Sequence, residues 1–467
     1  MIPLSLAEIA AAVSGQQRDI PDPDIRVTGP VVYDSRKVAP GSLFAAFDGE
    51  HVDGHDFAHQ AVSSGAVAVL ATRPVGVPAI IVDDVTAALG ALARRTVEGL
   101  GTQVVALTGS AGKTSTKDLL AQLLERLGPT VWPDGSLNNE IGLPITALRA
   151  ADDTRYLVLE MGARGIGHIR YLAELVPPKI GVVLNVGAAH IGEFGSRQGT
   201  AQAKGELVEA LPSAEDGGVA VLNADDPLVR AMAARTSARL LLFGEAADAD
   251  VRAENVRLTD QGRPAFTLHT PTGYSDVTLR LYGEHHVSNA LAAAAVACEL
   301  GMPVEEIAEA LSAADTLSRW RMEVSERADG VTVVNDAYNA NPDSMRAALR
   351  ALAAMGRGRR TWAVLGEMAE LGDESLTEHD AVGRLAVRLN VQKLVAVGGR
   401  EAAWLDMGAK NEGSWGEESV HVSDAQAAVD LLRGELRPGD VVLVKASRSV
   451  GLERIALSLL EGEVPVR

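Results

Sequence analysis

The sequence predicts an α/β protein with three domains: a small N-terminal α/β domain, a central phosphate-loop domain whose parallel sheet has a β-rich flank, and a C-terminal Rossmann-like domain. Three observations lead to this prediction. The chain has 467 residues, which is too long for a single hydrophobic core. A glycine-rich turn near residue 110 joins a buried strand to an amphipathic helix. Strand and helix patterns alternate over residues 102–319 and again over 323–467, which is typical of parallel sheets. We therefore place the domains at residues 1–98, 99–322 and 323–467.

Composition and charge restrict the classes of protein to be considered. The chain is 47% hydrophobic and 22% charged, as expected for a globular protein, and its net charge is −19. This charge argues against sequence-independent nucleic-acid binding, because such binding needs Lys and Arg to neutralise phosphates. The one cysteine, Cys298, excludes an intrachain disulfide, fits a reducing compartment and is expected to pack in an alanine-rich helix.

The sequence contains no recognisable targeting or membrane segment. The first basic residue is Arg18, and the early apolar run IAAAV is too short for a secretory signal. No apolar run approaches the roughly 18 residues of a membrane span. We therefore expect a cytoplasmic protein without membrane insertion, and we expect it to be a monomer.

The first 98 residues read as a small α/β unit. Apolar spacing predicts a short helix near the start of the chain, and β-branched runs predict strands at 31–33, 67–70 and 79–82. A polar segment at 34–57, DSRKVAPGSLFAAFDGEHVDGHDF, lies between the first two strands. Its density of donors and glycines suits either a surface loop or a site for a polar ligand.

The stretch VVALTGSAGKTSTK at 104–117 is the clearest chemical signal in the chain. Backbone N–H groups at a helix N-terminus lack carbonyl partners, so a polyphosphate can accept their hydrogen bonds where glycines allow close approach. Lys113 would add a positive charge for the terminal phosphates, and the Thr114 hydroxyl can bind Mg²⁺. Leu107 stands where the common pattern has its first glycine, so only the GKT end of the motif matches fully.

Polar residues follow three predicted strands of the central domain. Its strands are expected at 104–108, 156–160, 180–185, 219–222 and 240–243, followed by a β-rich stretch at 251–281. Ligands of parallel sheets bind beyond the carboxyl ends of the strands, where Thr114, Glu160 and His190 are expected. Mg²⁺ prefers hard oxygen ligands, so Glu160 is the best candidate carboxylate. Read from its surroundings alone, Lys204 is an ordinary surface lysine on a helix.

The last 145 residues, 323–467, repeat the alternation without a second phosphate loop. Strands are expected at 331–335, 362–365, 393–397, 419–422 and 441–445. The turn after the first of them, NDAYNANPDS at 335–344, carries more amides and acids than a simple connector needs.

Ten ordered segments extend the comparison from one motif to nearly the whole chain. They are TGSAGKTS, SLNNEIGLP, LEMGARGIG, NVGAAHIGEFGS, AQAKGEL, GEHHVSNALAAAA, RMEV, NDAYNANPDSM, LGEMAELG and VLVKASR. In content and order the chain resembles the Mur ligases of cell-wall synthesis. The resemblance implies an N-terminal domain that holds a uridine nucleotide, a central ATPase domain and a C-terminal domain that brings the second substrate.

The resemblance also implies roles for individual residues. Ser35 and Arg36 would lie near the uridine nucleotide, and Tyr338, Asn339 and Asn341 would lie in the region of the second substrate. The residues expected to bind ATP are Gly109, Ser110, Ala111, Gly112, Lys113, Thr114, Ser115, Asn289, Arg321 and Asp336. The expected Mg²⁺ site comprises Thr114, Glu160, His190 and Lys204, the last as a carbamate formed with CO₂. The expected catalytic residues are Lys113, Lys204, His190, Asn138 and Asn139.

The implied reaction is an ATP-dependent amide ligation. The pairing of DAYNANPDS with LGEMAELG is similar to family members that add D-alanyl-D-alanine to UDP-N-acetylmuramoyl tripeptide through an acyl-phosphate. His286, Asn335, Ala337 and Ala446 depart from the common family pattern, which affects details of the dipeptide pocket more than the reaction. Two alternatives remain: a sister ligase that adds a different amino acid, and a phosphate-loop ATPase whose hydrolysis drives a partner interaction.

Overall fold

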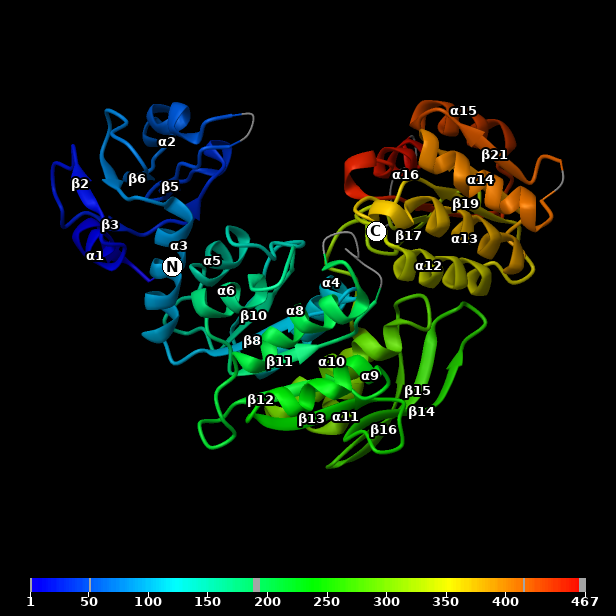
Figure 1. Cartoon of the computed structure of the whole chain (residues 1–467), viewed down its shortest axis with the longest axis horizontal. Coiled ribbons are helices and arrows are strands. Elements are labelled where there is room, and N and C mark those ends of the chain that lie inside the picture. Colours follow the sequence, from blue (N-terminus) through cyan, green and yellow to red (C-terminus); the bar gives the residue numbers. More distant parts are fainter. Residues whose placement is uncertain (1, 50–51, 188–193, 415, 462–467) are drawn as a thin grey trace.

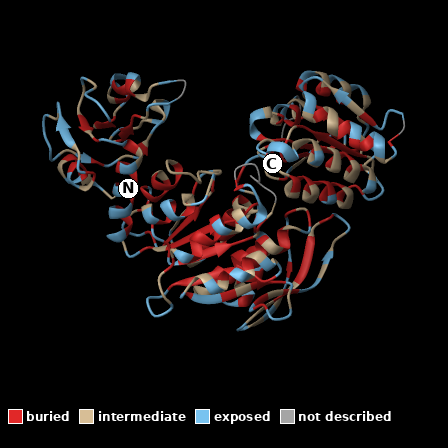
Figure 2. Cartoon of the chain, in the orientation of Figure 1, coloured by how far each residue is buried: buried red, intermediate tan, exposed pale blue. Residues whose placement is uncertain are grey.

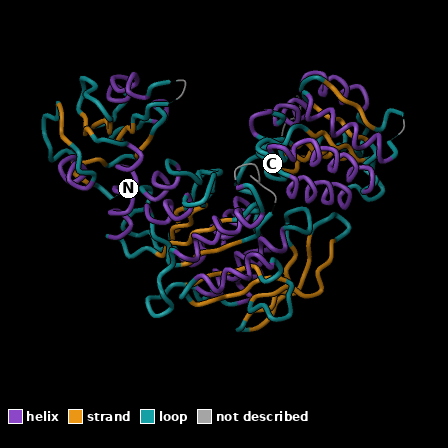
Figure 3. Tube along the Cα trace, viewed as in Figure 1, coloured by secondary structure: helices purple, strands orange, loops and turns teal. Residues whose placement is uncertain are grey.

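The structure is a computed structural model that describes residues 2–49, 52–187, 194–414 and 416–461. Figure 1 shows three bodies, with the central one between an N-terminal body and a C-terminal body. Each is a sheet with helices packed on it, as the tube in Figure 3 makes plain, so the predicted α/β class and three-domain organisation are confirmed.

The N-terminal sheet has the order β2-β7-β6-β5-β4, and its strands are parallel except for β2. Its strands are β2 (Gln16–Arg18), β4 (Val31–Val32), β5 (Leu43–Ala45), β6 (Ala68–Ala71) and β7 (Ala79–Ile81), and β1 (Leu4–Ser5) pairs separately with β3 (Arg26–Val27). The helices are α1 (Leu6–Ala12), α2 (Ala58–Ser63) and α3 (Val85–Glu98). The predicted helix and three predicted strands are confirmed, whereas β5 lies inside the segment that looked like a polar loop.

The central sheet has the order β16-β15-β14-β13-β12-β11-β8-β10-β9 and is parallel from β9 to β14. Its parallel strands are β8 (Gln103–Thr108), β9 (Thr130–Val131), β10 (Tyr156–Glu160), β11 (Ile180–Val183), β12 (Val219–Asn223), β13 (Arg239–Gly244) and β14 (Val251–Leu258). The antiparallel strands β15 (Pro264–Thr270) and β16 (Gly273–Thr278) complete the predicted β-rich flank. The helices are α4 (Lys113–Leu127), α5 (Gly142–Ala147), α6 (His168–Leu175), α8 (Arg197–Glu209), α9 (Pro227–Arg230), α10 (His286–Glu299) and α11 (Val304–Ala313).

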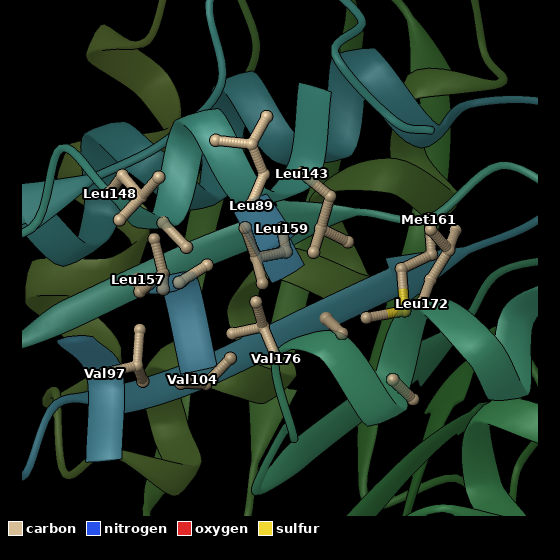
Figure 4. Close-up of a cluster of buried hydrophobic side chains, with 14 of the residues drawn as sticks. Leu89, Val97, Val104, Leu143, Leu148, Leu157, Leu159, Met161, Leu172 and Val176 are labelled. Atoms are coloured by element: carbon tan, nitrogen blue, oxygen red, sulfur yellow. The ribbon is translucent and has the colours of Figure 1, made fainter. Parts of the chain in front are cut away.

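The hydrophobic core runs without interruption across residue 98. Figure 4 shows Leu89 and Val97 of α3 beside Leu157 and Leu159 of β10. The same cluster of buried side chains includes Leu70 of the N-terminal sheet. Helix α3 therefore joins the N-terminal and central cores, and in Figure 2 the buried residues follow the strands of each sheet. Removing apolar area from water is the main stabilising contribution, so α3 ties the stability of the two bodies together.

The C-terminal sheet has the order β17-β18-β22-β19-β20-β21 and is parallel except for its edge strand β17. The strands are β17 (Glu323–Glu326), β18 (Thr332–Asn335), β19 (Thr361–Leu365), β20 (Lys393–Val397), β21 (Ser419–Val422) and β22 (Val441–Lys445). The helices are α12 (Pro342–Met355), α13 (Ser375–Arg388), α14 (Arg400–Glu412), α15 (Ala425–Glu435) and α16 (Glu453–Leu460). All five predicted strands are confirmed, and β17 was not predicted.

Within the described ranges, no helix combines the length and the apolar character needed to cross a membrane. Cys298 lies half-buried in α10, where burial raises the pKa of its thiol, as suits a packing residue.

Candidate active site

The glycine-rich turn lies between β8 and α4, where the sequence predicted it. Gly112 caps α4 with a φ of +81°, a conformation that favours glycine, and a Cβ there would clash with the side-chain oxygen of Asn289. Asn185 fixes the shape of the turn from the neighbouring strand end. Its Oδ1 accepts the N–H groups of Ser110 and Ala111, each at 2.9 Å, and its Nδ2 donates to the Ala111 carbonyl at 3.0 Å.

Lys113 folds back over the turn that precedes it. Its ammonium donates to the Gly109 carbonyl at 2.9 Å. Burial lowers the pKa of Lys113, an effect that nearby Glu160 opposes and Arg321 reinforces. The residue is thus held where a phosphate placed on the turn would meet a cation.

A cluster of polar side chains centres on Glu160, the last residue of β10. Glu160 is only 1% exposed. One carboxylate oxygen accepts from the Thr114 hydroxyl at 3.0 Å, and the other accepts from Ser136 Oγ and Asn138 Nδ2, both at 2.8 Å. Strand β10 lies between β8 and β9 in the sheet, and Thr114 follows β8 whereas Ser136 and Asn138 follow β9, so the strand order brings these groups together. Ser136 was not predicted, because a single serine in a loop carries no periodic signal.

The donor set around Glu160 fits Mg²⁺ bound together with a polyphosphate. It offers one carboxylate and two hydroxyl groups, which are hard oxygen ligands, and Mg²⁺ commonly takes one or two carboxylates plus phosphate oxygens and waters. In the part of the chain that the structure describes, no three His, Cys, Asp or Glu residues are grouped as a metal site of their own.

The Glu160 cluster makes the requirement for Mg²⁺ testable. Replacing Glu160 with Gln removes the only carboxylate charge of this cluster, so the Mg²⁺ concentration for half-maximal turnover should rise by about tenfold or more. Titration of Mg²⁺ into chelator-treated protein measures this shift. Glu174→Gln, an exposed change on α6 of the same domain, should leave the titration unchanged. Equal Mg²⁺ requirements for Glu160→Gln and the unmodified chain would contradict the assignment.

Lys204 lies on α8 and lines the same cavity as the turn. It is 3% exposed, so its interpretation as a surface lysine is wrong. Burial lowers the pKa of Lys204 well below its usual range, and nearby Lys113 lowers it further. Surroundings of this kind favour the uncharged, nucleophilic form of a lysine amine. The other predicted residue of this region, His190, lies outside the described residues.

The opposite wall of the cavity comes from the segment after α11 and from the C-terminal domain. Arg321 donates from Nη2 to the Thr114 hydroxyl at 3.1 Å, and its guanidinium lies 4.3 Å from the ring centre of Tyr338. Asn341 caps α12 and donates from Nδ2 to the Ser110 carbonyl at 3.4 Å. The resulting cavity of about 690 Å³ is lined by groups that include Tyr33, Ser110–Ser115, Asn138, Asn139, Glu160, Lys204, Arg321, Tyr338, Asn339 and Asn341.

Some predicted residues lie away from this cavity or have other partners. Ser35 and Arg36 are not among its lining residues; Arg36 is exposed and pairs with Asp34, while the preceding Tyr33 does line the cavity. Asp336 is buried behind the wall, where it accepts from Lys445 Nζ at 2.7 Å and from the Met322 N–H at 3.0 Å.

Two predicted asparagines have local partners as well. The Asn139 side chain accepts the Gly142 N–H at 2.9 Å at the start of α5 while it lines the cavity. Asn289 is buried against Gly112.

Comparison with known proteins decides the family. The Mur ligase middle domain matches residues 107–297, the Mur ligase glutamate ligase domain matches 320–448, and the Mur ligase family catalytic domain matches 30–97. The chain belongs to the Mur ligase family.

Individual relatives of this Mur ligase cover nearly its whole length. It is 51% identical to the UDP-N-acetylmuramoyl-tripeptide--D-alanyl-D-alanine ligase of Mycobacterium tuberculosis, over 98% of each chain. It is 37% identical to the Escherichia coli protein of the same name, over 99% of each chain. Among solved structures, MurF from Acinetobacter baumannii superposes with a TM-score of 0.86 at 33% identity, covering 98% of this chain and 99% of that one. The MurF ligase of Thermotoga maritima, solved in complex with ADP, gives a TM-score of 0.78 at 30% identity, covering 92% of this Mur ligase and 97% of its own chain.

Proposed function

We propose that this Mur ligase joins D-alanyl-D-alanine to UDP-N-acetylmuramoyl tripeptide, using ATP, and so forms the UDP-muramoyl pentapeptide of peptidoglycan synthesis. The relatives that match it over nearly their whole length carry this activity in their names. The observation in the molecule that carries the proposal is the cavity that joins the phosphate-binding turn to residues of NDAYNANPDS.

The reaction proceeds in two steps. The terminal carboxylate of the tripeptide attacks the γ-phosphorus of ATP, giving an acyl-phosphate and ADP. The amine of D-alanyl-D-alanine then attacks the acyl carbon, forms a tetrahedral intermediate and displaces phosphate with loss of a proton. An anion must approach an anion in the first step, so the half-buried cations that line the cavity, Lys113 and Arg321, lower its cost.

The Glu160 cluster would hold Mg²⁺ beside the phosphates, where the cation neutralises charge that develops on the phosphate oxygens. The chain itself fixes the line of attack through Asn185 and the turn that it holds. No side chain needs to form a covalent intermediate.

Lys204 would complete the site as a carbamate. An uncharged amine can add to CO₂ with loss of a proton, which replaces a potential cation with an anionic oxygen ligand. Burial and the charge of Lys113 both favour the uncharged amine. The same Lys113 charge would favour the later anion, since the carbamate would face that ammonium.

The division of labour follows the three sheets. Residues 1–98 would bind the uridine part of one substrate, 99–322 would bind ATP, and 323–467 would bring the dipeptide, with Tyr338, Asn339 and Asn341 near the reacting end. A cytoplasmic protein remains our prediction, since nucleotide substrates of this kind are made and used inside the cell. That the protein is a monomer is a separate prediction.

Phosphate release from ATP and Mg²⁺ with UDP-muramoyl tripeptide tests the proposed function. We expect release to require D-alanyl-D-alanine, and to be absent with D-Ala, D-Glu, L-Lys or diaminopimelate alone. Release with one of the single amino acids would keep the fold and the chemistry but assign the chain to a sister ligation. Release that is indifferent to every acceptor would contradict ligation and favour an ATPase switch.

A further inference from the structure

A second buried polar cluster lies beneath the active site, outside the cavity. It consists of Lys117 and Asp118 on α4 and Ser318 in the segment after α11, which are 1%, 3% and 6% exposed. None of these residues lines the cavity described above. Burying a charged pair is costly unless its hydrogen bonds are satisfied, so the partners of this cluster indicate what it does.

The Lys117 ammonium holds the loop that carries Ser136. It donates to the carbonyls of Pro133 and Gly135, at 3.1 and 3.2 Å, directly before the serine that contacts Glu160. It also contacts Asp118 at 2.6 Å and donates to Ser318 at 3.1 Å. The Lys117 ammonium therefore binds two segments that are far apart in sequence, one at Pro133 and Gly135, and the other at Ser318.

Asp118 holds the segment that leads to Arg321. Its carboxylate accepts the N–H of Ser318 and the hydroxyl of the same residue, each at 2.9 Å. Gln122, one helical turn further along α4, forms a second anchor through the backbone of Asp315, with hydrogen bonds of 2.9 and 3.1 Å. Only three residues beyond Ser318, Arg321 returns to the Thr114 hydroxyl at the start of the same helix.

The residues on each side of Arg321 have an unfavourable backbone conformation, so other contacts must hold this segment in place. Trp320 and Met322 have φ values of +60° and +49°, a region that residues with a side chain rarely occupy. Their backbone is held by outside contacts: Glu323 accepts the N–H of Trp320 at 3.1 Å, and Asp336 accepts that of Met322 at 3.0 Å. A strained backbone persists only where its surroundings over-determine it.

We propose that Lys117, Asp118 and Ser318 form a clasp whose function is to position Ser136 and Arg321, which both contact the Thr114 hydroxyl at the start of α4. These are positioning residues that act through their neighbours and touch no substrate. Two of the clasp residues, Lys117 and Asp118, lie on α4, the helix that follows the glycine-rich turn. The clasp therefore couples the position of this turn to the positions of Ser136 and Arg321. The inference rests on the proposed use of ATP by this cavity.

Two variants of graded severity test the clasp. Ser318→Ala removes the hydroxyl that contacts both Lys117 and Asp118, and Lys117→Met removes the charge while keeping much of the side-chain volume. We expect kcat/KM for ATP to fall about tenfold in the first and about a hundredfold in the second, with a raised KM for ATP in both. Ser318→Thr, which keeps the hydroxyl, should recover most of the loss. Arg126→Ala, which removes an exposed ion pair with Glu309 two turns further along α4, serves as the matched control and should behave like the unmodified chain.

A purely structural contribution gives a different result. Partial unfolding lowers the amount of active protein and therefore kcat, but it leaves the KM for ATP unchanged. Circular dichroism shows which variants are folded. If Lys117→Met does not fold, the KM for ATP of Ser318→Ala alone distinguishes positioning from a purely structural contribution.

Coupling to Arg321 provides the second readout. If the clasp acts by placing Arg321, the double variant Lys117→Met/Arg321→Ala should lose much less than the product of the two single losses. Losses that simply multiply, or a Ser318→Ala protein with the unmodified KM for ATP, would overturn the proposal.

Affinity for a fluorescent ADP analogue separates failure of the clasp from failure of the proposed function. If the unmodified chain binds the analogue but does not ligate, the proposed reaction is wrong, and the comparison of affinities among the variants still tests the clasp. Equal affinities in Ser318→Ala and the unmodified chain would then count against it.

Discussion

Replacing Lys113 with Ala is expected to reduce turnover by about 10³-fold while leaving the fold intact. The ammonium is held at the phosphate-binding turn by the Gly109 carbonyl, and its burial makes its interaction with an anion stronger than it would be in water. The first step brings two anions together, so the loss should appear mainly in kcat. Rapid-quench measurement of acyl-phosphate or ADP formation locates the effect in that step.

Lys179→Ala is the matched control for this experiment. Lys179 is an exposed lysine of the same domain, next to the start of β11 and thus at the opposite end of the sheet. The control should retain full turnover and the same thermal stability. A near-normal rate in Lys113→Ala would contradict the proposed chemistry of the turn.

Replacing Lys204 with Ala is expected to reduce turnover by about 10²-fold to 10³-fold, and small carboxylates should restore part of it. The change removes the amine that would carry the carbamate and leaves a space in which acetate or formate can supply the missing anionic oxygens. Rates measured over a range of acetate concentrations should therefore rise and then saturate. Unmodified protein should be indifferent to added acetate.

Lys204→Met separates chemical rescue from a general effect of salt. Methionine fills most of the space that alanine leaves, so the Met variant should lose a similar amount of activity without responding to acetate. If no carboxylate raises the rate of Lys204→Ala above that of Lys204→Met, the carbamate assignment is wrong.

The sequence predicts most strands of the parallel sheets and misses strands that are short or polar. The strands at 156–160, 393–397, 419–422 and 441–445 appear with the predicted bounds. Three of them, β10, β20 and β22, are buried along nearly their whole length, and such strands form apolar runs. The fourth, β21, lies at the sheet edge, where its sequence SVHV alternates valine with polar residues. By contrast β17, with the sequence EVSE, has a single apolar residue and exists because it pairs with β18 at the sheet edge. The three-residue β5 was missed for a different reason: its sequence LFA is apolar and buried between β4 and β6, but it is short and lies in a segment rich in polar residues and glycines.

The site shows the same division between local and long-range information. The turn and Glu160 could be located from residue types because the turn directly follows an apolar strand and Glu160 ends one. The roles of Asn185 and Ser136 depend on which strands become neighbours, and nothing in their own surroundings indicates it. Lys204 is the sharpest case, since its residue-level environment predicts exposure while the fold buries it beside another lysine. Only its resemblance to a family position indicated a function.

The strained segment between α11 and β17 also sets the effective concentration of the C-terminal domain at the central domain. It links the domain that carries the glycine-rich turn to the domain that carries Tyr338 and Asn341, and both domains line the cavity. The two halves of the cavity therefore belong to one covalent chain. Short tethers of this kind correspond to local concentrations in about the millimolar range. A chain cut within this segment would have to rebuild its cavity by collision of two fragments, and its ligation rate at ordinary dilution would become second order in protein.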